Sequence, residues 1–238
     1  MSQGSVIGEE IARFDALAAN WWDPQGPMRP LHMMNPPRAA WVAERVRRHH
    51  GSEVTILDVG CGAGLLAESL AREGFSVTGL DAGAEVIAAA RAHAQDQGGQ
   101  GLNLTYRQGT AEALAAEGAK FSVITALEII EHVADPAAFL TSLRTLLTPG
   151  GLLFLSTLNR TPKSYAVAKM GAEYILRLLP VGTHEWKKFI TPVELGGLCR
   201  AAGLRLADTA GLSYSPLQGG FKVSRDLSVN YLAMAVAD

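Results

Sequence analysis

Apolar runs of strand length alternate with segments of helical texture from residue 54 onward. The strand-like runs lie at residues 54–59, 76–80, 102–106, 121–127 and 152–157. Helical segments are predicted at residues 65–72, 84–95, 136–147 and 192–202. Residues 204–206 and 229–236 add two late strands, the second of which we expect to run antiparallel. This alternation predicts an α/β fold with a doubly wound, mostly parallel sheet that is covered on both faces.

Two regions do not follow the alternation. Residues 7–19 place apolar side chains at helical spacing, which predicts an amphipathic helix. Residues 24–37 contain five prolines and one glycine, so we expect an irregular stretch there. A second helix is expected to follow Pro37 and to run to about His50. Residues 162–190 mix apolar and basic side chains and interrupt the alternation again.

The composition excludes several classes of protein. The 238 residues include 21 basic and 23 acidic residues, and this near balance argues against a general nucleic-acid binder, which shows a strong basic excess. The sequence has two cysteines, Cys61 and Cys199, which points to a reducing compartment. No apolar run reaches the ~18 residues of a membrane-spanning helix, and the first residues do not resemble a signal peptide. We therefore expect a cytoplasmic protein that does not bind nucleic acid.

A glycine-rich turn follows the first predicted strand. It reads Asp58-Val59-Gly60-Cys61-Gly62-Ala63-Gly64. Such a turn lets the backbone approach a ligand closely, and the helix behind it offers free N–H groups. Asp81 ends the second strand, where a carboxylate can accept hydrogen bonds from both hydroxyls of a ribose. Together the turn and Asp81 predict a nucleoside cofactor at the carboxyl edge of the sheet.

The turn does not have the glycine spacing of a dinucleotide site, G-x-G-x-x-G. Asp58 would also repel a pyrophosphate, whereas it would favour a cationic amino-acid group. A nicotinamide site and a glycine-rich turn without any ligand are the two weaker alternatives. The pattern D-x-G-x-G-x-G instead resembles the first motif of class I S-adenosylmethionine-dependent methyltransferases.

Longer segments resemble one family within that class, the ubiquinone-biosynthesis O-methyltransferases. They include Trp21-Trp22-Asp23, Glu128-Ile129-Ile130-Glu131-His132-Val133, Ser156-Thr157-Leu158-Asn159-Arg160 and Gly182-Thr183-His184. The resemblance spans about residues 7–232. It implies a Rossmann-like class I fold with a seven-stranded, mostly parallel sheet. It also implies a helical lid segment at residues 1–50, and a methyltransferase domain at residues 51–238 with an insertion at about 162–190.

The resemblance further implies methyl transfer from S-adenosylmethionine to a phenolic oxygen of polyprenylated phenol or catechol intermediates, at two steps of ubiquinone biosynthesis. The cofactor-binding residues that it implies are Arg38, Gly60, Gly62, Asp81 and Leu127. Arg38 would pair with the methionine carboxylate and Asp81 would hold the ribose. Leu127 would line the adenosine pocket.

Glu128, Glu131 and His132 are spaced at i, i+3 and i+4, so on a helical turn they would share one face. Two carboxylates and an imidazole can hold a divalent metal such as Mg²⁺, which would lower the pKa of a ring hydroxyl. Alternatively, His132 is a catalytic general base without a metal. A third interpretation is a turn with a solvated face, in which His132 caps the local backbone. The sequence leaves these three interpretations open.

The expected substrate is a polyprenylated quinone precursor, and its long apolar tail makes a membrane surface a candidate partner. Residues 162–190 combine lysines with aromatic residues, as amphipathic segments on an anionic membrane do, and the alternative is a lid that faces water. A complex of ubiquinone-biosynthesis proteins is a further candidate partner. Two other functions stay open: an O-methyltransferase for another small phenol, and a non-catalytic cofactor-binding module for assembly. Retention of Arg38, Asp81 and the cluster of Glu128, Glu131 and His132 argues against the non-catalytic module.

Overall fold

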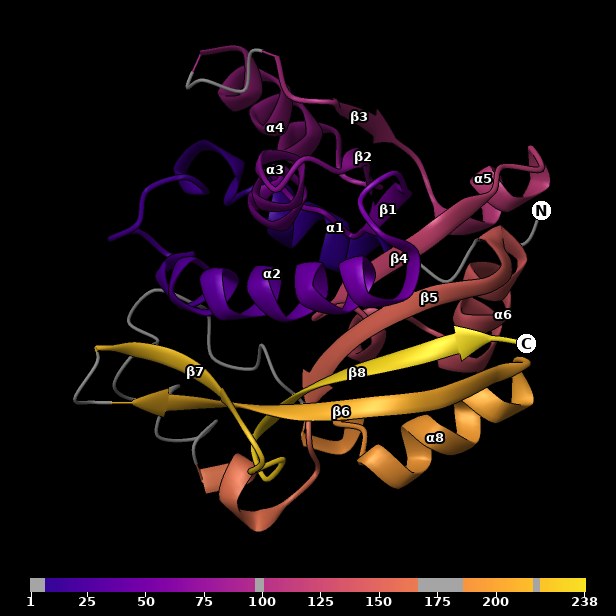
Figure 1. The fold of residues 1–238 in the computed structure, drawn as a ribbon. Coiled ribbons are helices and arrows are strands. Elements are labelled where there is room, and N and C mark those ends of the chain that lie inside the picture. Colours follow the sequence, from indigo (N-terminus) through magenta and orange to yellow (C-terminus); the bar gives the residue numbers. More distant parts are fainter. Residues whose placement is uncertain (1–6, 97–100, 167–185, 216–218) are drawn as a thin grey trace.

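The computed structural model describes residues 7–96, 101–166, 186–215 and 219–238. In these residues one sheet of eight strands has the order β3-β2-β1-β4-β5-β8-β6-β7 (Figure 1). The strands are β1 (Thr55–Val59), β2 (Ser76–Asp81), β3 (Leu104–Gln108), β4 (Phe121–Leu127), β5 (Leu147–Leu158), β6 (Leu204–Ser215), β7 (Gly220–Ser224) and β8 (Asn230–Ala237). Strands β1 to β5 pair in parallel, whereas β8 pairs antiparallel with both β5 and β6. The predicted α/β class and the antiparallel last strand are confirmed.

The expected number of seven strands is wrong, because β7 adds an eighth. This edge strand pairs antiparallel with the far end of β6, from Gly211 opposite Ser224 to Ser215 opposite Gly220. Its side chains are half-buried or exposed, so it has no continuous apolar run that marks it in the sequence. The same pairing extends β6 to Ser215, well beyond the predicted residues 204–206.

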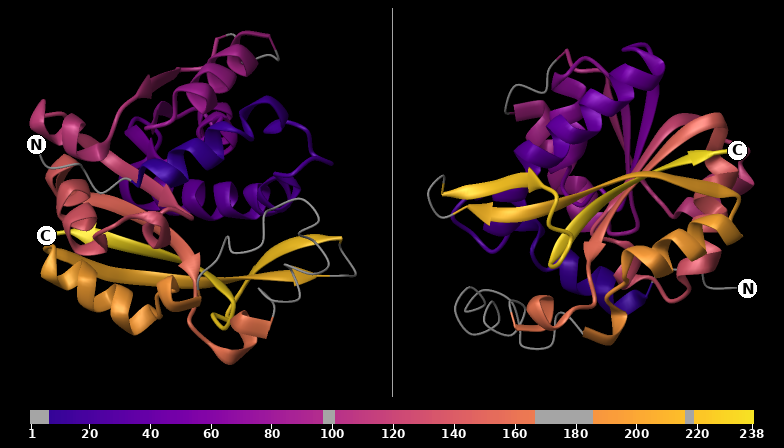
Figure 2. Two further views of the ribbon diagram at one scale, coloured as in Figure 1. Left: turned by 180° about the vertical axis from the view of Figure 1, so that it is seen from behind. Right: turned by 60° about the horizontal axis from the view of Figure 1, so that its bottom comes forward.

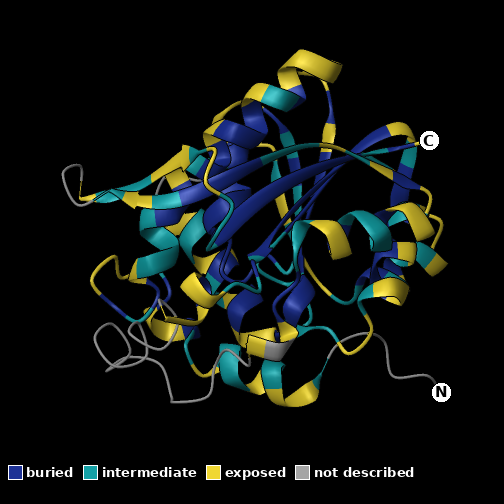
Figure 3. Ribbon diagram, turned by 90° about the horizontal axis from the view of Figure 1, so that it is seen from below, coloured by how far each residue is buried: buried dark blue, intermediate teal, exposed yellow. Residues whose placement is uncertain are grey.

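Helices cover both faces of the sheet. The helices are α1 (Gly8–Asp15), α2 (Arg29–His50), α3 (Leu65–Arg72), α4 (Ala84–Asp96), α5 (Ala111–Ala116), α6 (Pro136–Leu146) and α8 (Pro192–Ala201). Neighbouring residues of one strand face opposite layers. Leu57 belongs to the apolar cluster with α5, α6 and α8, whereas Ile56 belongs to the cluster with α2 and α3. The sheet interior is therefore buried from both sides, as Figures 2 and 3 show.

Helix α2 begins much earlier than the proline content suggests. The stretch expected to be irregular contains its first two turns, and Pro36 and Pro37 lie inside the helix. Each proline removes one backbone hydrogen bond, so the helix needs support from outside. The buried Asn35 amide provides it by donating to the Leu65 carbonyl oxygen at 2.9 Å and to Ser69 Oγ at 2.8 Å. Contacts with α3 therefore override the local preference.

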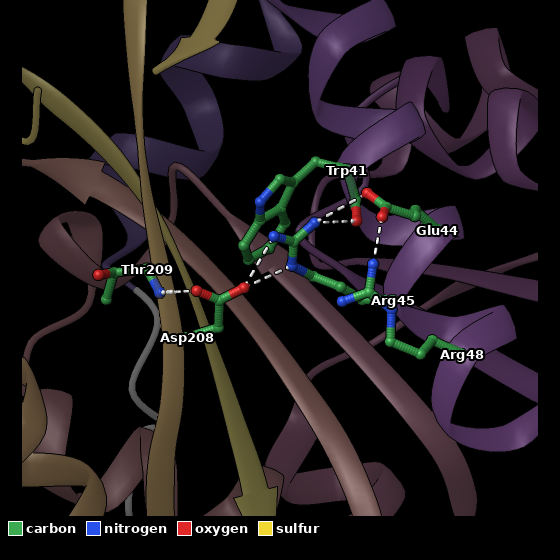
Figure 4. A network of polar contacts seen from close by, with 6 residues as sticks. All are labelled: Trp41, Glu44, Arg45, Arg48, Asp208 and Thr209. Carbon is green, nitrogen blue, oxygen red and sulfur yellow. Dashed lines mark hydrogen bonds and ion pairs between the residues drawn. The ribbon is translucent and has the colours of Figure 1, made fainter. Parts of the chain in front are cut away.

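A second set of polar contacts joins α2 to β6 (Figure 4). The guanidinium of Arg45 lies 3.9 Å from the ring centre of Trp41. Its Nε and Nη2 donate to Asp208 Oδ2 at 2.8 and 2.7 Å. Asp208 stands where the pairing of β6 with β8 shifts in register, and its other oxygen accepts from the Thr209 backbone N–H at 2.8 Å. Helix α2 is thus joined to β6, one of the late strands of the sheet.

The predicted insertion at residues 162–190 falls largely outside the described residues, since residues 167–185 are not described. In the described parts of the chain, no helix is both long enough and apolar enough to cross a membrane. The division of the chain at residue 50 stays a prediction.

Tyr106 packs beneath the glycine-rich turn and sets a limit on the residue at position 64. Gly64 has a φ of +93°, and a Cβ added there would lie 2.0 Å from the Tyr106 hydroxyl oxygen. Gly74 has the same φ of +93°, but among the described residues nothing lies within 4 Å of an added Cβ. The two positions therefore share the backbone strain and differ in the steric overlap.

We expect Gly74→Ala to lower the free energy of unfolding by about 1–2 kcal/mol through left-handed backbone strain alone. Gly64→Ala should lower it by a further 1–3 kcal/mol or so, because the methyl group overpacks against Tyr106. Urea unfolding followed by circular dichroism measures both. Equal losses would mean that the Tyr106 ring moves aside without cost.

Candidate active site

A cavity of about 420 Å³ opens at the carboxyl ends of β1, β2 and β4. Doubly wound sheets bind ligands at this edge. The residues that the sequence predicted for the cofactor and for the chemistry all line it: Arg38, Gly60, Gly62, Asp81, Leu127, Glu128, Glu131 and His132. Residues of α1 and α2 close the cavity on the remaining sides, and Figure 2 shows α1, in indigo, next to the strand ends. Segments far apart in the sequence thus form one site.

The glycine-rich turn is covered by the two tryptophans of the N-terminal segment. Gly62 has a φ of +53°, and a Cβ there would lie 2.2 Å from Trp21 Cζ2. The Trp22 indole N–H donates to the Ala63 carbonyl oxygen at 3.0 Å, and its ring stacks on His93 with ring centres 3.4 Å apart. The Trp-Trp motif therefore holds the N-terminal segment against the turn.

Asp81 is oriented by backbone N–H groups. Its Oδ2 accepts from the Gly62 N–H and its Oδ1 accepts from the Gly83 N–H, both at 2.9 Å. Burial raises the pKa of Asp81, and these two hydrogen bonds oppose that rise. Each carboxylate oxygen has two lone pairs, so the fixed side chain retains acceptor capacity for two hydroxyl groups. This is the arrangement that a ribose requires.

Arg38 and Asp58 bring unpaired polar atoms to the cavity. The Arg38 side chain is buried, and its Nε has no hydrogen-bond partner among the described residues. Asp58 Oδ1 accepts from the Thr125 hydroxyl at 2.6 Å, whereas its Oδ2 has no partner within the described ranges. Burial raises the pKa of Asp58 to about 7. A ligand with both a carboxylate and an ammonium group would supply both missing partners.

Glu128 directly follows Leu127, the last residue of β4, and adopts an unusual backbone conformation. Its φ of +55° is the one positive value among the described residues other than glycine. Its carboxylate accepts from Ser156 Oγ at 2.6 Å and from Asn230 Nδ2 at 3.0 Å, and its Oε1 lies 3.7 Å from Arg38 Nη1. Glu128 is therefore anchored to β5 and β8 and faces the guanidinium on α2.

The spacing of Glu128, Glu131 and His132 predicted that they share one face of a helical turn, and the backbone does not form that turn. Glu128 lies before the short 3-10 helix Ile130–His132, so the three residues do not share the face of one helical turn. Neither carboxylate oxygen of Glu131 has a hydrogen-bond partner in the described part of the chain. Burial, followed by the charge of Glu128, raises the pKa of Glu131. Among the described residues, no group of three His, Cys, Asp or Glu side chains could hold a metal ion.

His132 lies against α1. Its Nδ1 is 3.2 Å from Glu10 Oε2, and the Phe14 ring meets the imidazole edge-on at a centroid distance of 5.8 Å. Burial lowers the pKa of His132, while the carboxylate of Glu10 opposes that shift. The imidazole is therefore neutral at neutral pH, the state in which it can accept a proton.

The sequence predicted a lid segment at residues 1–50 but did not single out Glu10, Phe14 and Trp21, which line the cavity. Glu10 and Phe14 are four residues apart on α1 and so share one face of that helix. The amphipathic pattern of residues 7–19 identified the helix but not the structure that its apolar face covers. The helix predicted at residues 7–19 is observed as α1 followed by a short 3-10 helix, Ala18–Asn20.

Comparison with known proteins agrees with this geometry. The methyltransferase domain family matches residues 16–209. The chain is 49% identical to the ubiquinone biosynthesis O-methyltransferase of Parvibaculum lavamentivorans, covering 98% of this chain and 95% of that protein. It is also 49% identical to the protein of the same name from Azotobacter vinelandii, covering 96% of each.

Among solved structures, the fold is similar to magnesium protoporphyrin IX methyltransferase from Synechocystis PCC 6803 with bound SAH. The TM-score is 0.69, and the match covers 97% of this chain and 100% of that chain. At 20% identity this likeness shows the fold alone. The full-length relatives show more: the chain is a methyltransferase and belongs to the family of the ubiquinone biosynthesis O-methyltransferases.

Proposed function

We propose that the protein transfers a methyl group from S-adenosylmethionine to a phenolic oxygen of polyprenylated phenol and catechol intermediates, at both O-methylation steps of ubiquinone biosynthesis. The observation that carries this proposal is the pair of unsatisfied polar atoms on Arg38 and Asp58, together with the remaining acceptor capacity of Asp81, around one cavity. They match the carboxylate, the ammonium and the ribose of that co-substrate. The names of the full-length relatives support the choice of acceptor.

Each part of the co-substrate has a residue to hold it. Arg38 pairs with the methionine carboxylate, and the free oxygen of Asp58 accepts from the ammonium group. Asp81 accepts from the ribose hydroxyls, and Leu127 lines the adenosine pocket. Gly60 and Gly62 let the backbone of the turn lie close to the methionine part. S-adenosylmethionine supplies an electrophilic methyl group on a positively charged sulfur.

The reaction is a displacement at the methyl carbon. The phenolic oxygen forms the new O–C bond while the C–S bond breaks, and sulfur keeps the electron pair of that bond. The phenolic proton must go to a base. His132 lies at the cavity wall and burial lowers its pKa, which favours the neutral imidazole, whereas burial and the charge of Glu128 raise the pKa of Glu131. His132 therefore acts as the general base without a metal.

Alignment and exclusion of water supply the rest of the rate. The oxygen must approach opposite to sulfur, so a wall that fixes the ring lowers the barrier. Phe14 and Trp21 contribute apolar surface to the cavity, and their ring centres are 6.2 Å apart. Together with α1 they keep water from the sulfonium and from the phenolate.

The isoprenoid tail of the acceptor leads to a membrane proposal. We propose that residues 162–190 touch the anionic cytoplasmic face of a membrane from which the substrate is taken. The described flanks support this: the side chain of Tyr165 is 51% exposed, that of Trp186 is 37% exposed, and their ring centres lie 6.0 Å apart. Interfacial aromatic side chains with nearby lysines bind anionic bilayer surfaces.

Asp81→Ala should weaken binding of S-adenosylhomocysteine at least tenfold, because two ribose hydroxyls lose a charged acceptor worth roughly 1.5–3 kcal/mol per hydrogen bond. Isothermal titration calorimetry measures the dissociation constant. Glu85→Ala is the matched control, because it removes an exposed carboxylate from the adjacent first turn of α4. An unchanged dissociation constant for Asp81→Ala would remove the ribose assignment.

His132→Ala should lower kcat about 10²–10⁴-fold, the contribution of a positioned general base. The activity of the unmodified protein should persist in EDTA, because His132 needs no metal in this mechanism. His50→Ala, an exposed histidine at the end of α2, is the control. Loss of activity in EDTA that returns with Mg²⁺ would contradict the metal-free mechanism, and full activity of His132→Ala would remove His132 from the chemistry.

The double variant Lys187→Glu, Lys188→Glu should float less than the unmodified protein with vesicles of phosphatidylglycerol and phosphatidylcholine. Each basic residue near such a surface contributes about 1 kcal/mol, so two charge reversals lower binding at least tenfold. The control is Arg200→Glu with Arg205→Glu, which changes the charge equally at two exposed arginines in the last turn of α8 and at the start of β6. Equal flotation of both double variants, or no flotation of the unmodified protein, would favour a lid that faces water.

A further inference from the structure

We propose that Glu128 is a positioning residue for Arg38: its carboxylate holds the guanidinium away from Asp58, so that Arg38 binds the methionine carboxylate and Asp58 binds the ammonium group. The inference rests on the proposed function, which assigns these two ends of the methionine part to Arg38 and Asp58. It gives Glu128 a role that requires no metal ion.

Glu128 has a backbone conformation that is unfavourable for its residue type. Its φ of +55° lies in the left-handed region, where glycine, asparagine and aspartate predominate. Other residues persist there only when their surroundings hold them, and such residues concentrate at functional sites. The Glu128 backbone N–H donates to the carbonyl oxygen of Ser156 at 3.1 Å and to its Oγ at 2.9 Å. The strained residue is thus locked to β5, and it lines the cavity.

The Glu128 carboxylate is fixed by donors from two neighbouring strands. Ser156 Oγ, on β5, donates to its Oε1 at 2.6 Å. Asn230 Nδ2, at the start of β8, lies 3.0 Å from Oε1 and 3.2 Å from Oε2. Both donor residues are buried. Hydrogen bonds of this kind compensate a carboxylate for the loss of water, so Glu128 is an anion with a fixed position.

Arg38 lies between two carboxylates. Its Nη1 is 3.7 Å from Glu128 Oε1, and the two side chains are 6% and 20% exposed. Burial lowers the pKa of Arg38, and the charges of Glu128 and, to a smaller extent, Asp58 oppose that shift. Asp58 Oδ1 accepts from Thr125, whereas its Oδ2 has no partner within the described ranges. Without the charge of Glu128, the guanidinium would be attracted by Asp58 alone.

A guanidinium that turned toward Asp58 would impair the site twice. It would occupy the carboxylate oxygen assigned to the ammonium group, and it would turn the unpartnered Nε of Arg38 away from the cavity. The distance of 3.7 Å to Glu128 is that of an ion pair and exceeds a hydrogen bond, so this contact uses no N–H donor. Arginine binds a carboxylate best through two parallel N–H groups, so the orientation of its plane decides the affinity. Glu128 therefore acts on the ligand through Arg38.

The test compares Glu128→Gln with Glu73→Gln, which removes the carboxylate of an exposed ion pair with Arg47 outside the cavity. Calorimetry in EDTA measures the binding of S-adenosylhomocysteine and of 5′-methylthioadenosine, which keeps the adenosine thioether but lacks the amino-acid part. Glu128→Gln should weaken S-adenosylhomocysteine about tenfold or more, the loss of an oriented hydrogen bond between charged groups, and 5′-methylthioadenosine by less than about twofold. Glu73→Gln should change neither affinity.

Two further variants separate positioning from other roles of Glu128. Asn230→Ala removes a donor that holds the carboxylate but keeps its charge. It should weaken S-adenosylhomocysteine in the same direction and by less, again without an effect on 5′-methylthioadenosine. In an Arg38→Ala background, Glu128→Gln should weaken S-adenosylhomocysteine no further, because residues that act through one another are not additive.

Three results would overturn the inference. An equal loss of affinity for both ligands would indicate a general disturbance of the cavity. Additive losses in Arg38→Ala with Glu128→Gln would mean that Glu128 contacts the ligand directly. A loss seen with Mg²⁺ but not in EDTA would make Glu128 a metal ligand instead.

The proposed function can fail separately. If Arg38→Ala binds S-adenosylhomocysteine as tightly as the unmodified protein, the assignment of the methionine carboxylate to Arg38 is wrong. If Arg38→Ala loses affinity for S-adenosylhomocysteine alone while Glu128→Gln keeps it, that assignment stands and only the positioning role fails.

Discussion

Trp21 lies so close to the glycine-rich turn that position 62 has no space for a side chain. This contact decides where the N-terminal segment rests on the sheet, and the rest of the site depends on it. Trp22 adds a hydrogen bond to Ala63, and Asn35 adds two to α3 directly behind the turn. Because these contacts hold both α1 and α2, the same packing that shapes the cofactor loop also delivers Arg38 and Glu10 to the cavity. The glycine-rich turn thus lines the cavity and also contacts the N-terminal segment that covers the cavity.

Much of the fold could be predicted because its strands are buried on both faces. Strands β1, β4 and the core of β5 read as mostly apolar runs bounded by glycine or a polar residue, a pattern typical of strands that helices cover on both sides. The sequence pattern did not predict two elements, the edge strand β7 and the first turns of α2. The edge strand β7 carries half-exposed side chains, and α2 passes through Pro36 and Pro37 because long-range contacts of Asn35 support it. Neither effect is encoded within a few neighbouring residues.

The candidate site, like the fold, could be predicted from the sequence only in part. Asp81 and the glycine-rich turn were predictable, because strand, turn and helix follow one another in the chain and fix their geometry locally. The helical face expected for Glu128, Glu131 and His132 is not formed, because Glu128 takes a left-handed conformation directly after β4, and their use as metal ligands stays a prediction. The partner of His132 comes from α1, more than a hundred residues earlier. Spacing within a motif cannot reveal such a partner.

The position of β8 has a consequence for synthesis on the ribosome. This strand is translated after β6 and β7, yet it lies between β5 and β6 in the sheet and is buried along most of its length. About 70 residues separate the end of β5 from the start of β8, which corresponds to several seconds at roughly 5–20 residues per second. Until β8 has been made, β5 lacks its native neighbour on that side, and an unpaired strand edge is the kind of edge that pairs with other chains.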